Sequence, residues 1–339
     1  MMGDLLASSP LPRPVKIPGR PGEAGIVKSK DNCNVSGMVQ KIVLLREWLA
    51  IGWAGSMLQA ATFIRFLDER TPKNKCSIVS LFGIINSYSR SDFSQLDVIV
   101  MFGSKKEFSV FEINHEIGRM NVDPFQVGDL NCYCIGSGVP DFYNKISDFV
   151  SSEALDGAPS RADIDESIAI SFMCTNLFRN YAPGGFESGW GGGFEIVSPG
   201  VRGSFKKLDK ILITFSAYDS FGLVRSSENF IFQYYEGSNL VIININVNDG
   251  SEELHLITPP NRTTVRPRFN RISKRVNYFV HVSYPESGGA VIVRVQHLDN
   301  SKGPVRAFVT RTDSHTKLAI SNEIISRSND ELAIAIRNL

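Results

Sequence analysis

The segment AIGWAGSMLQAATFI, residues 50–64, combines small residues with the pattern of an apolar helix. Gly52, Ala54 and Gly55 stand where a buried strand passes into that helix. Glycine and alanine let another backbone come close, or they leave backbone N–H groups uncovered for a ligand. The segment therefore predicts either tight packing alone or the floor of a substrate groove lined by backbone donors.

A second candidate is the basic segment NRTTVRPRFNRISKRV, residues 261–276. Basic side chains interleaved with Phe269 could bind phosphates or an acidic protein surface. A solvated loop between two strands explains the same composition without a ligand. The cations of this candidate anion-binding segment are Arg262, Arg266, Arg268, Arg271, Lys274 and Arg275.

Histidine placement argues against several other chemistries. His115 is the single histidine of the first 200 residues, so a Ser-His-Asp or Cys-His arrangement is not expected there. The later histidines are isolated among expected strands and lack the spacing of metal ligands. GWAGSM also lacks the GK[ST] of a phosphate-binding loop. We therefore expect neither a metal nor a cofactor.

The composition indicates an ordinary globular protein. The 339 residues carry a net charge of +1, which gives no general attraction to nucleic acid or to a membrane surface. No apolar run approaches 18 residues, so no membrane span is expected. The cysteines form no CxxC pair, which favours a reducing compartment and a cytoplasmic location. They are Cys33, Cys76, Cys132, Cys134 and Cys174.

Periodicity and turn residues predict two regions after an N-terminal arm. Residues 1–24 are rich in Pro and Gly and predict an arm or an irregular edge strand. The first region mixes both element types: helices are expected over 55–70, 77–91, 139–155 and 162–178, and strands over 24–32, 40–54, 96–103, 107–113, 130–136 and 189–200. From about residue 205 to the end, including 331–339, eight short strands are expected, which favours an antiparallel β-sandwich or barrel.

The motifs of the first region add a resemblance. DNCNVSGMVQKI, LAIGWAGSMLQA, CIGSG, TN and GGGFEI follow one another in the order and spacing of the proteasome β-subunit group of N-terminal-nucleophile (Ntn) hydrolases. They are most similar to the bacterial proteasome-like peptidases, over roughly residues 24–200. The resemblance implies an α+β fold: an αββα four-layer sandwich over 25–203, after the arm of 1–24 and before the all-β, sandwich-like domain of 204–339.

The resemblance also implies a reaction. In this family an N-terminal Thr, Ser or Cys attacks a carbonyl, and its own α-amine acts as the base. Lys41 matches the lysine that activates the nucleophile. Asp31 matches the aspartate that holds this lysine, although the interval between them is shorter than in typical members. Without the resemblance, Lys41 is a solvated strand lysine and Asp31 a turn former.

Two further parts of the family site have counterparts. The strand end with Gly52, Ala54 and Gly55 matches the segment whose amides form the oxyanion hole. Ser137 matches the serine that orients the amine, or it simply caps a helix that begins near Val139.

The nucleophile itself has no match. The family spacing places it near Val15, no threonine precedes Thr62, and Ser8 and Ser9 lie in a poor strand sequence. Two functions therefore stay open: a threonine- or serine-type amide-bond hydrolase whose nucleophile lies upstream of Met1, or a catalytically inactive assembly protein whose β-domain binds a partner. Either implies a homo-oligomer, and the first also implies a peptide or protein substrate. A third reading, an anion- or nucleic-acid-binding module at 262–275, is the weakest, and no nucleic-acid partner is expected.

Overall fold

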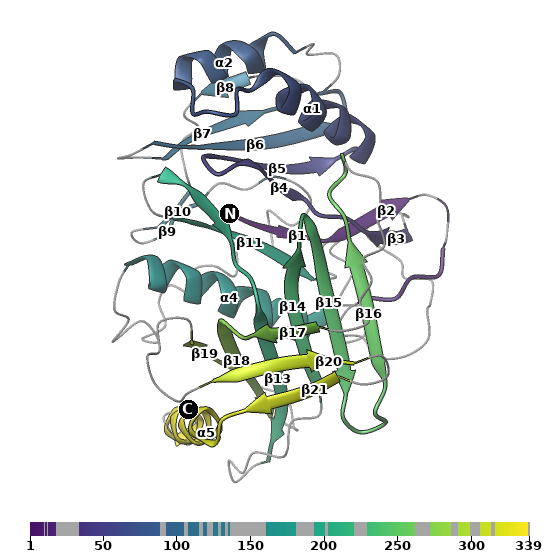
Figure 1. Ribbon diagram of the computed structural model, residues 1–339, viewed down its shortest axis with the longest axis vertical. Coiled ribbons are helices and arrows are strands. Elements are labelled where there is room, and N and C mark those ends of the chain that lie inside the picture. The colour runs from purple at the N-terminus through teal and green to yellow at the C-terminus, as the bar shows by residue number, and fades with distance from the viewer. Residues whose placement is uncertain are drawn as a thin grey trace.

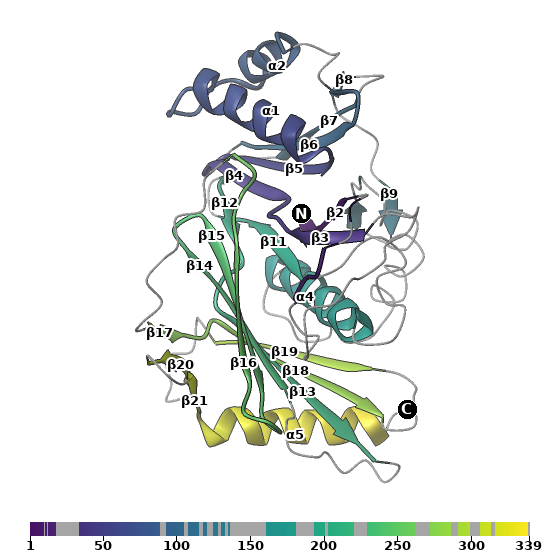
Figure 2. The same ribbon diagram turned by 90° about the vertical axis from the view of Figure 1, so that its right-hand side faces the viewer.

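Layers of helix and strand are stacked along the long axis of the molecule (Figures 1 and 2). The computed structural model describes residues 1–9, 11, 13–17, 34–88, 93–104, 108–114, 118–120, 125–127, 130–132, 135, 161–180, 193–200, 203–219, 229–261, 272–285, 291–298, 306–312 and 316–337. The mixture of helices and strands confirms the α+β class.

The first two layers are a helix pair and an antiparallel sheet. The helices are α1 (Met57–Arg70) and α2 (Ile78–Asn86), and the sheet has the order β4 (Ile42–Arg46), β5 (Leu49–Gly55), β6 (Leu96–Gly103), β7 (Phe108–Ile113), β8 (Gly118–Met120). Ser56 caps α1 by accepting a hydrogen bond from the Gln59 N–H. The helix then buries Phe63, Ile64 and Leu67 against the sheet.

The next two layers are further strands and one long helix. The strands are β1 (Met2–Asp4), β11 (Phe194–Pro199) and β12 (Phe205–Lys207), the pair β2 (Leu6–Ser9) and β3 (Asn34–Met38), and the hairpin β9 (Phe125–Val127) and β10 (Leu130–Cys132). Helix α4 (Arg161–Asn180) packs against β11 from the other side (Figure 2). Ile42, Val197 and Phe205 fill part of the space between the two strand layers.

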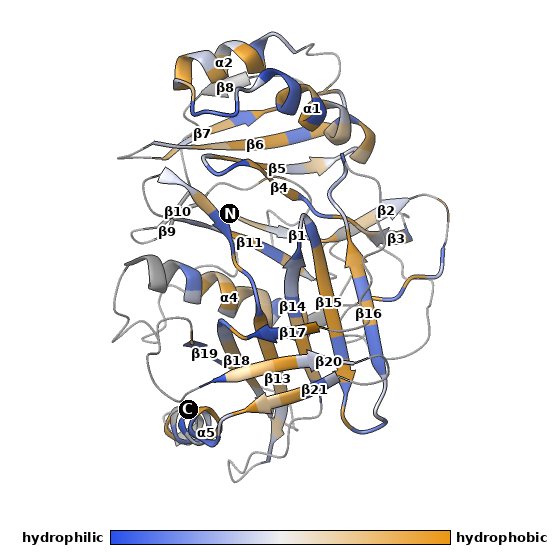
Figure 3. Ribbon diagram, in the orientation of Figure 1, coloured by the Kyte–Doolittle hydropathy of each residue, from blue (hydrophilic) through white to orange (hydrophobic). Residues whose placement is uncertain are grey.

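A six-stranded sheet lies beyond α4. Its order is β16 (Glu252–Ile257), β15 (Asn239–Asn246), β14 (Asn229–Glu236), β13 (Ile211–Tyr218), β18 (Tyr278–Pro285), β19 (Ile292–His297). One face packs on α4, and the opposite face packs on β17 (Ile272–Arg275), β20 (Ala307–Arg311), β21 (Thr316–Ile320) and α5 (Asn322–Arg337). Covered on both faces, strands such as β13 and β15 are largely apolar (Figure 3).

Two expectations for residues 204–339 are wrong. The region is not all-β, because residues 322–337 form α5, where Ile324 and Ser328 are buried one helical turn apart. The sheet is not wholly antiparallel either, since β13 and β18 run in the same direction. Alternation in a sequence shows which face of a strand is buried and says nothing of the direction of its neighbour.

Residues 1–24 were expected to form an arm or an irregular edge strand, and residues 1–9 form strands at the edges of their sheets. Residues 1–24 contain β1 and β2, which pair with β11 and β3. Both strands end before Pro10, so the prolines that suggested an arm do not interrupt them. The expected helices at 55–70 and 162–178 are confirmed, and α2 is shorter than the expected 77–91.

The expected strand at 24–32 and helix at 139–155 lie outside the described residues. Within the described part of the chain, no helix has both the length and the apolar character needed to cross a membrane.

Candidate functional site

Lys41 joins the two strand layers through an ion pair. The residue lies just before β4, and its ammonium donates to both carboxylate oxygens of Asp4, at 2.9 and 3.0 Å. Asp4 is the last residue of β1, in the neighbouring layer. Both side chains are largely buried, which strengthens a charge-assisted pair relative to one in water. Lys41 is therefore not a solvated strand lysine.

The small-residue strand end lies beside Lys41. Ile42 pairs with Gly52 across the β4–β5 ladder, and the Trp53 N–H donates to the Lys41 carbonyl oxygen at 3.0 Å. The N–H groups of an antiparallel strand alternate between its two neighbours. The Gly55 N–H is therefore directed to the same side as that of Trp53, past the point where β4 begins.

Backbone geometry requires glycine at position 55. Its φ is +96°, and a Cβ atom there would lie 2.2 Å from the Gln95 carbonyl oxygen. Ala54 is half-buried and pairs with Asp97 on β6. Close approach thus explains Gly55 by itself, while the same residue is exposed at the edge of the sheet.

The start of β1 covers Gly52. A Cβ atom at Gly52 would lie 2.9 Å from the Met1 sulfur, and the Met1 amine donates to the Val197 carbonyl oxygen at 2.9 Å. Met1 therefore lies against the small-residue strand end on one side and β11 on the other. The segment next to Lys41 and Gly52 consists of Met1, Met2, Gly3 and Asp4, and none of these residues carries a hydroxyl or thiol.

Most other predicted site residues cannot be placed. Asp31, Ser137, Arg266, Arg268 and Arg271 lie outside the described residues. Asp4, which sequence reasoning passed over, supplies the carboxylate on Lys41. The prolines a few residues after Asp4 made a strand at this position unexpected.

The two described cations of the basic segment have internal partners. Lys274 lies 3.2 Å from a Glu236 carboxylate oxygen, and its ammonium stands over the Tyr234 ring. Arg275 donates to the Leu298 carbonyl oxygen at 3.0 Å. These two side chains hold β17 on the sheet, which fits the interpretation of a connection between strands.

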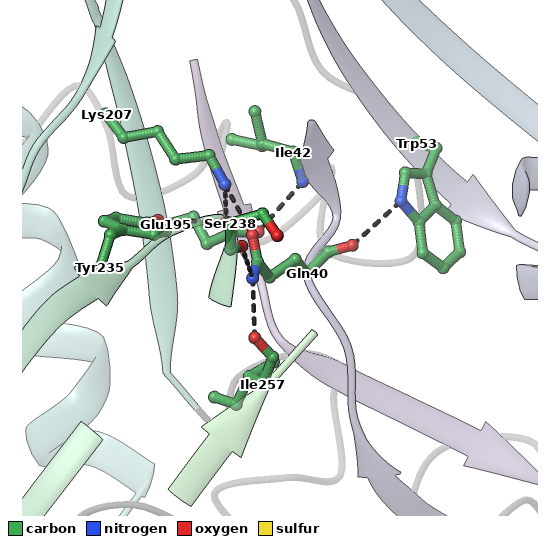
Figure 4. A network of polar contacts seen from close by, with 8 residues as sticks. All are labelled: Gln40, Ile42, Trp53, Glu195, Lys207, Tyr235, Ser238 and Ile257. Atoms are coloured by element: carbon green, nitrogen blue, oxygen red, sulfur yellow. Dashed lines mark hydrogen bonds and ion pairs between the residues drawn. The ribbon is translucent and has the colours of Figure 1, made fainter. Parts of the chain in front are cut away.

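A buried polar network that sequence reasoning missed centres on Glu195 of β11 (Figure 4). Its side chain is fully buried. One carboxylate oxygen accepts hydrogen bonds from Lys207, at 2.7 Å, and from the Tyr235 hydroxyl, at 3.1 Å. The other accepts from the Ile42 N–H at 3.0 Å. Burial and the neighbouring Glu195 carboxylate raise the pKa of Tyr235 well above its ordinary value.

Gln40 extends this network to the six-stranded sheet. Its side-chain oxygen accepts from Lys207 at 2.7 Å, and its side-chain nitrogen donates to the carbonyl oxygens of Ser238 and Ile257, both at 2.7 Å. The indole of Trp53 donates to the Gln40 carbonyl oxygen (Figure 4). The network thus binds β5, β11 and β12 to the β14–β16 edge, directly beside Lys41 in the sequence.

A second buried carboxylate, Glu166, fixes α4. It accepts hydrogen bonds from the Ser198 and Tyr278 hydroxyls, the latter at 2.5 Å, and pairs with Lys206 at 3.0 Å. Burial alone would raise the pKa of Glu166, but the hydrogen bonds and the lysine charge outweigh it and lower that pKa. The carboxylate is therefore a structural anion between α4, β11 and β18.

Metal ligation and relatives add no further constraint. Across the described ranges, no group of three His, Cys, Asp or Glu side chains could hold a metal ion. No protein-family model matches the chain, and a search of curated proteins finds no match either.

Proposed function

We propose that the layers of residues 1–203, with β1 and β2 in the second strand layer, have the αββα arrangement of the Ntn hydrolases and that this chain acts as a non-catalytic assembly protein. One observation carries the proposal: the Lys41 ammonium is held by Asp4, and no described hydroxyl or thiol shares it. A nucleophile activated by a lysine needs a hydroxyl or thiol within hydrogen-bond reach of that lysine. At this position the chain has Met1 against Gly52 instead.

The outer helix layer supports an interaction role. Leu58 of α1 and Val79 of α2 are each 76% exposed, and Met57 is 54% exposed. These helices form the layer farthest from the six-stranded sheet (Figure 1). We propose that these exposed apolar side chains contribute to a surface that binds another protein and that the partner is a second copy of this chain. The described Cys76 and Cys174 are free thiols, which suits a reducing compartment such as the cytoplasm.

Amide-bond hydrolysis is the second candidate function. It is favoured by the convergence of Lys41, the directed Gly55 N–H and the start of β1 at one edge of the sheet. A nucleophile would have to come from residues outside the described ranges or from a segment preceding Met1.

Two measurements separate the candidates. We expect no hydrolysis of fluorogenic peptides and no covalent labelling by a β-lactone or epoxyketone, with intact mass as the readout. Labelling that disappears in Lys41→Met would refute the non-catalytic proposal. For assembly, we expect light scattering to give a multiple of the chain mass, reduced in Leu58→Asp/Val79→Asp. The matched control Ile325→Asp changes an exposed apolar residue of α5 and should leave the mass unchanged. A monomeric wild-type chain would refute the assembly role.

A further inference from the structure

One end of the six-stranded sheet buries polar side chains on a face that is otherwise apolar. On the face toward α5, the central cross-strand row is Ile243, Phe232, Leu212 and Phe279. The adjacent rows of β13, β18 and β19 change character. They are Thr214–His281–Arg294 and Ser216–Ser283, each set directly opposite across the strands.

Three of these side chains have polar atoms without a partner. His281 is 7% exposed and Ser283 is 0% exposed, and neither His281 Nε2 nor Ser283 Oγ has a hydrogen bond. Arg294 is half-buried on the edge strand, and its Nε is likewise unpaired. Within the described part of the chain, no ion pair joins Arg294 to a carboxylate. A buried polar atom without a hydrogen bond destabilises the folded protein, so three such atoms on one face require an explanation.

The tautomer of His281 follows from its neighbours. The Thr214 hydroxyl has one proton, which it donates to the Val280 carbonyl oxygen at 3.2 Å. The His281 Nδ1–H must therefore donate to the Thr214 oxygen, 3.0 Å away. Burial lowers the pKa of His281 to about 4, so the ring is neutral at pH 7. Its Nε2 atom is then a bare acceptor that calls for a donor.

From these groups we propose a binding site for a protonated oxyanion, hydrogen phosphate or the monoanion of a phosphate monoester, formed by His281, Ser283 and Arg294. The anionic oxygens accept from the Arg294 guanidinium and the Ser283 hydroxyl. The remaining P–OH group donates to His281 Nε2. Phosphate retains a proton near neutral pH and sulfate does not, so the bare imidazole nitrogen selects between two anions of similar size.

We place the entry to the site at β19, which is the edge strand of the six-stranded sheet. Helix α5 is anchored to β19 by the hydrogen bond from the Gln296 side-chain nitrogen to the Ser328 hydroxyl, at 2.7 Å. Arg294 lies two residues before Gln296 on the same face and stays half-exposed at the sheet edge. A ligand that reaches His281 would pass this guanidinium first. A positive charge at the entrance attracts an anion.

Calorimetric titration of the full chain with inorganic phosphate and with sulfate, at pH 7 and equal ionic strength, tests the site. We expect phosphate to bind at least tenfold more tightly than sulfate. Arg294→Gln should weaken phosphate at least tenfold, and the exposed control Arg306→Gln should not. Equal affinity for the two anions, no binding of phosphate, or unchanged binding in Arg294→Gln would overturn the proposal.

Ser283→Ala is a second variant, chosen because it should fold normally. Removing an unpaired buried hydroxyl should leave the free energy of unfolding unchanged or slightly higher, while phosphate binding weakens. If phosphate binding persists undiminished in this folded variant, Ser283 is not part of a site. A parallel titration with phenyl phosphate distinguishes the two ligands. Tighter binding of inorganic phosphate identifies the free ion as the ligand, and tighter binding of the ester identifies a phosphate monoester.

Discussion

Among the described residues, Lys207 is the one cation paired with the buried Glu195 carboxylate, so Lys207→Met isolates the contribution of this pair. The ammonium contacts Glu195 and Gln40, each at 2.7 Å, and lies 4.6 Å from the centroid of the Tyr235 ring. Removing one partner of a buried ion pair typically costs about 3–5 kcal/mol, because the other charge stays buried. Methionine keeps most of the apolar stem, so little of this cost comes from lost packing.

The expected loss can be apportioned with a double variant. Glu195→Gln/Lys207→Met removes both charges and should be destabilised by only about 1–2 kcal/mol, since a neutral amide still bonds the Ile42 N–H and the Tyr235 hydroxyl. Urea unfolding followed by circular dichroism at pH 7 measures both. Lys16→Met is the matched control: Lys16 pairs with Glu253 at 3.0 Å but is half-exposed, so its removal should cost less than about 1 kcal/mol.

The comparison with Lys16→Met decides the outcome. A Lys207→Met loss no larger than that of Lys16→Met would refute the reasoning.

Three other outcomes follow from single contacts. Gly55→Ala should lower the free energy of unfolding by about 3 kcal/mol, because φ is positive and the new Cβ would approach Gln95. Gly83→Ala has open space around its position in α2 and should be neutral or stabilising. The urea midpoints of the two variants test this difference. Because its folded pKa is lowered, Glu166 adds stability that is present above the ordinary pKa of about 4.3 and lost as the pH falls below it; Glu166→Gln should flatten the urea midpoint between pH 5 and 3. Burial raises the pKa of both thiols, most for the fully buried Cys174, so iodoacetamide should alkylate Cys76 first and Cys174 only on unfolding, by peptide mapping.

The sequence predicted the local elements that have their own chemical pattern. The helical patterns of residues 55–70 and 162–178 predicted α1 and α4. Lys41 lies next to the strand end at Gly52 because β4 and β5, two strands so close in sequence, pair as neighbours.

Contacts between distant segments could not be predicted in the same way. Asp4 reaches Lys41 because β1 pairs with β11, some 190 residues later, and nothing within the first ten residues encodes that partner. In the sequence, Glu195 is a charge inside the apolar strand GFEIV. A charge in such a strand indicates a buried partner but does not identify it. Residues 331–337 alternate in polarity and by themselves predict a strand. The helical period of α5 becomes visible only together with the nine residues that precede them.

The position of α4 bears on how a second copy could bind. Its side chains Phe172, Met173 and Leu177 share one core with Phe194 of β11 and with the six-stranded sheet, so the helix is covered on two sides. Glu166 ties it to β11 and β18 as well. In the αββα arrangement that we propose, α4 would be one of the two outer helix layers through which copies could associate, but the six-stranded sheet covers it. The proposed self-association is therefore confined to α1 and α2, which is why Leu58 and Val79, rather than any residue of α4, are the positions whose change should alter the mass in solution.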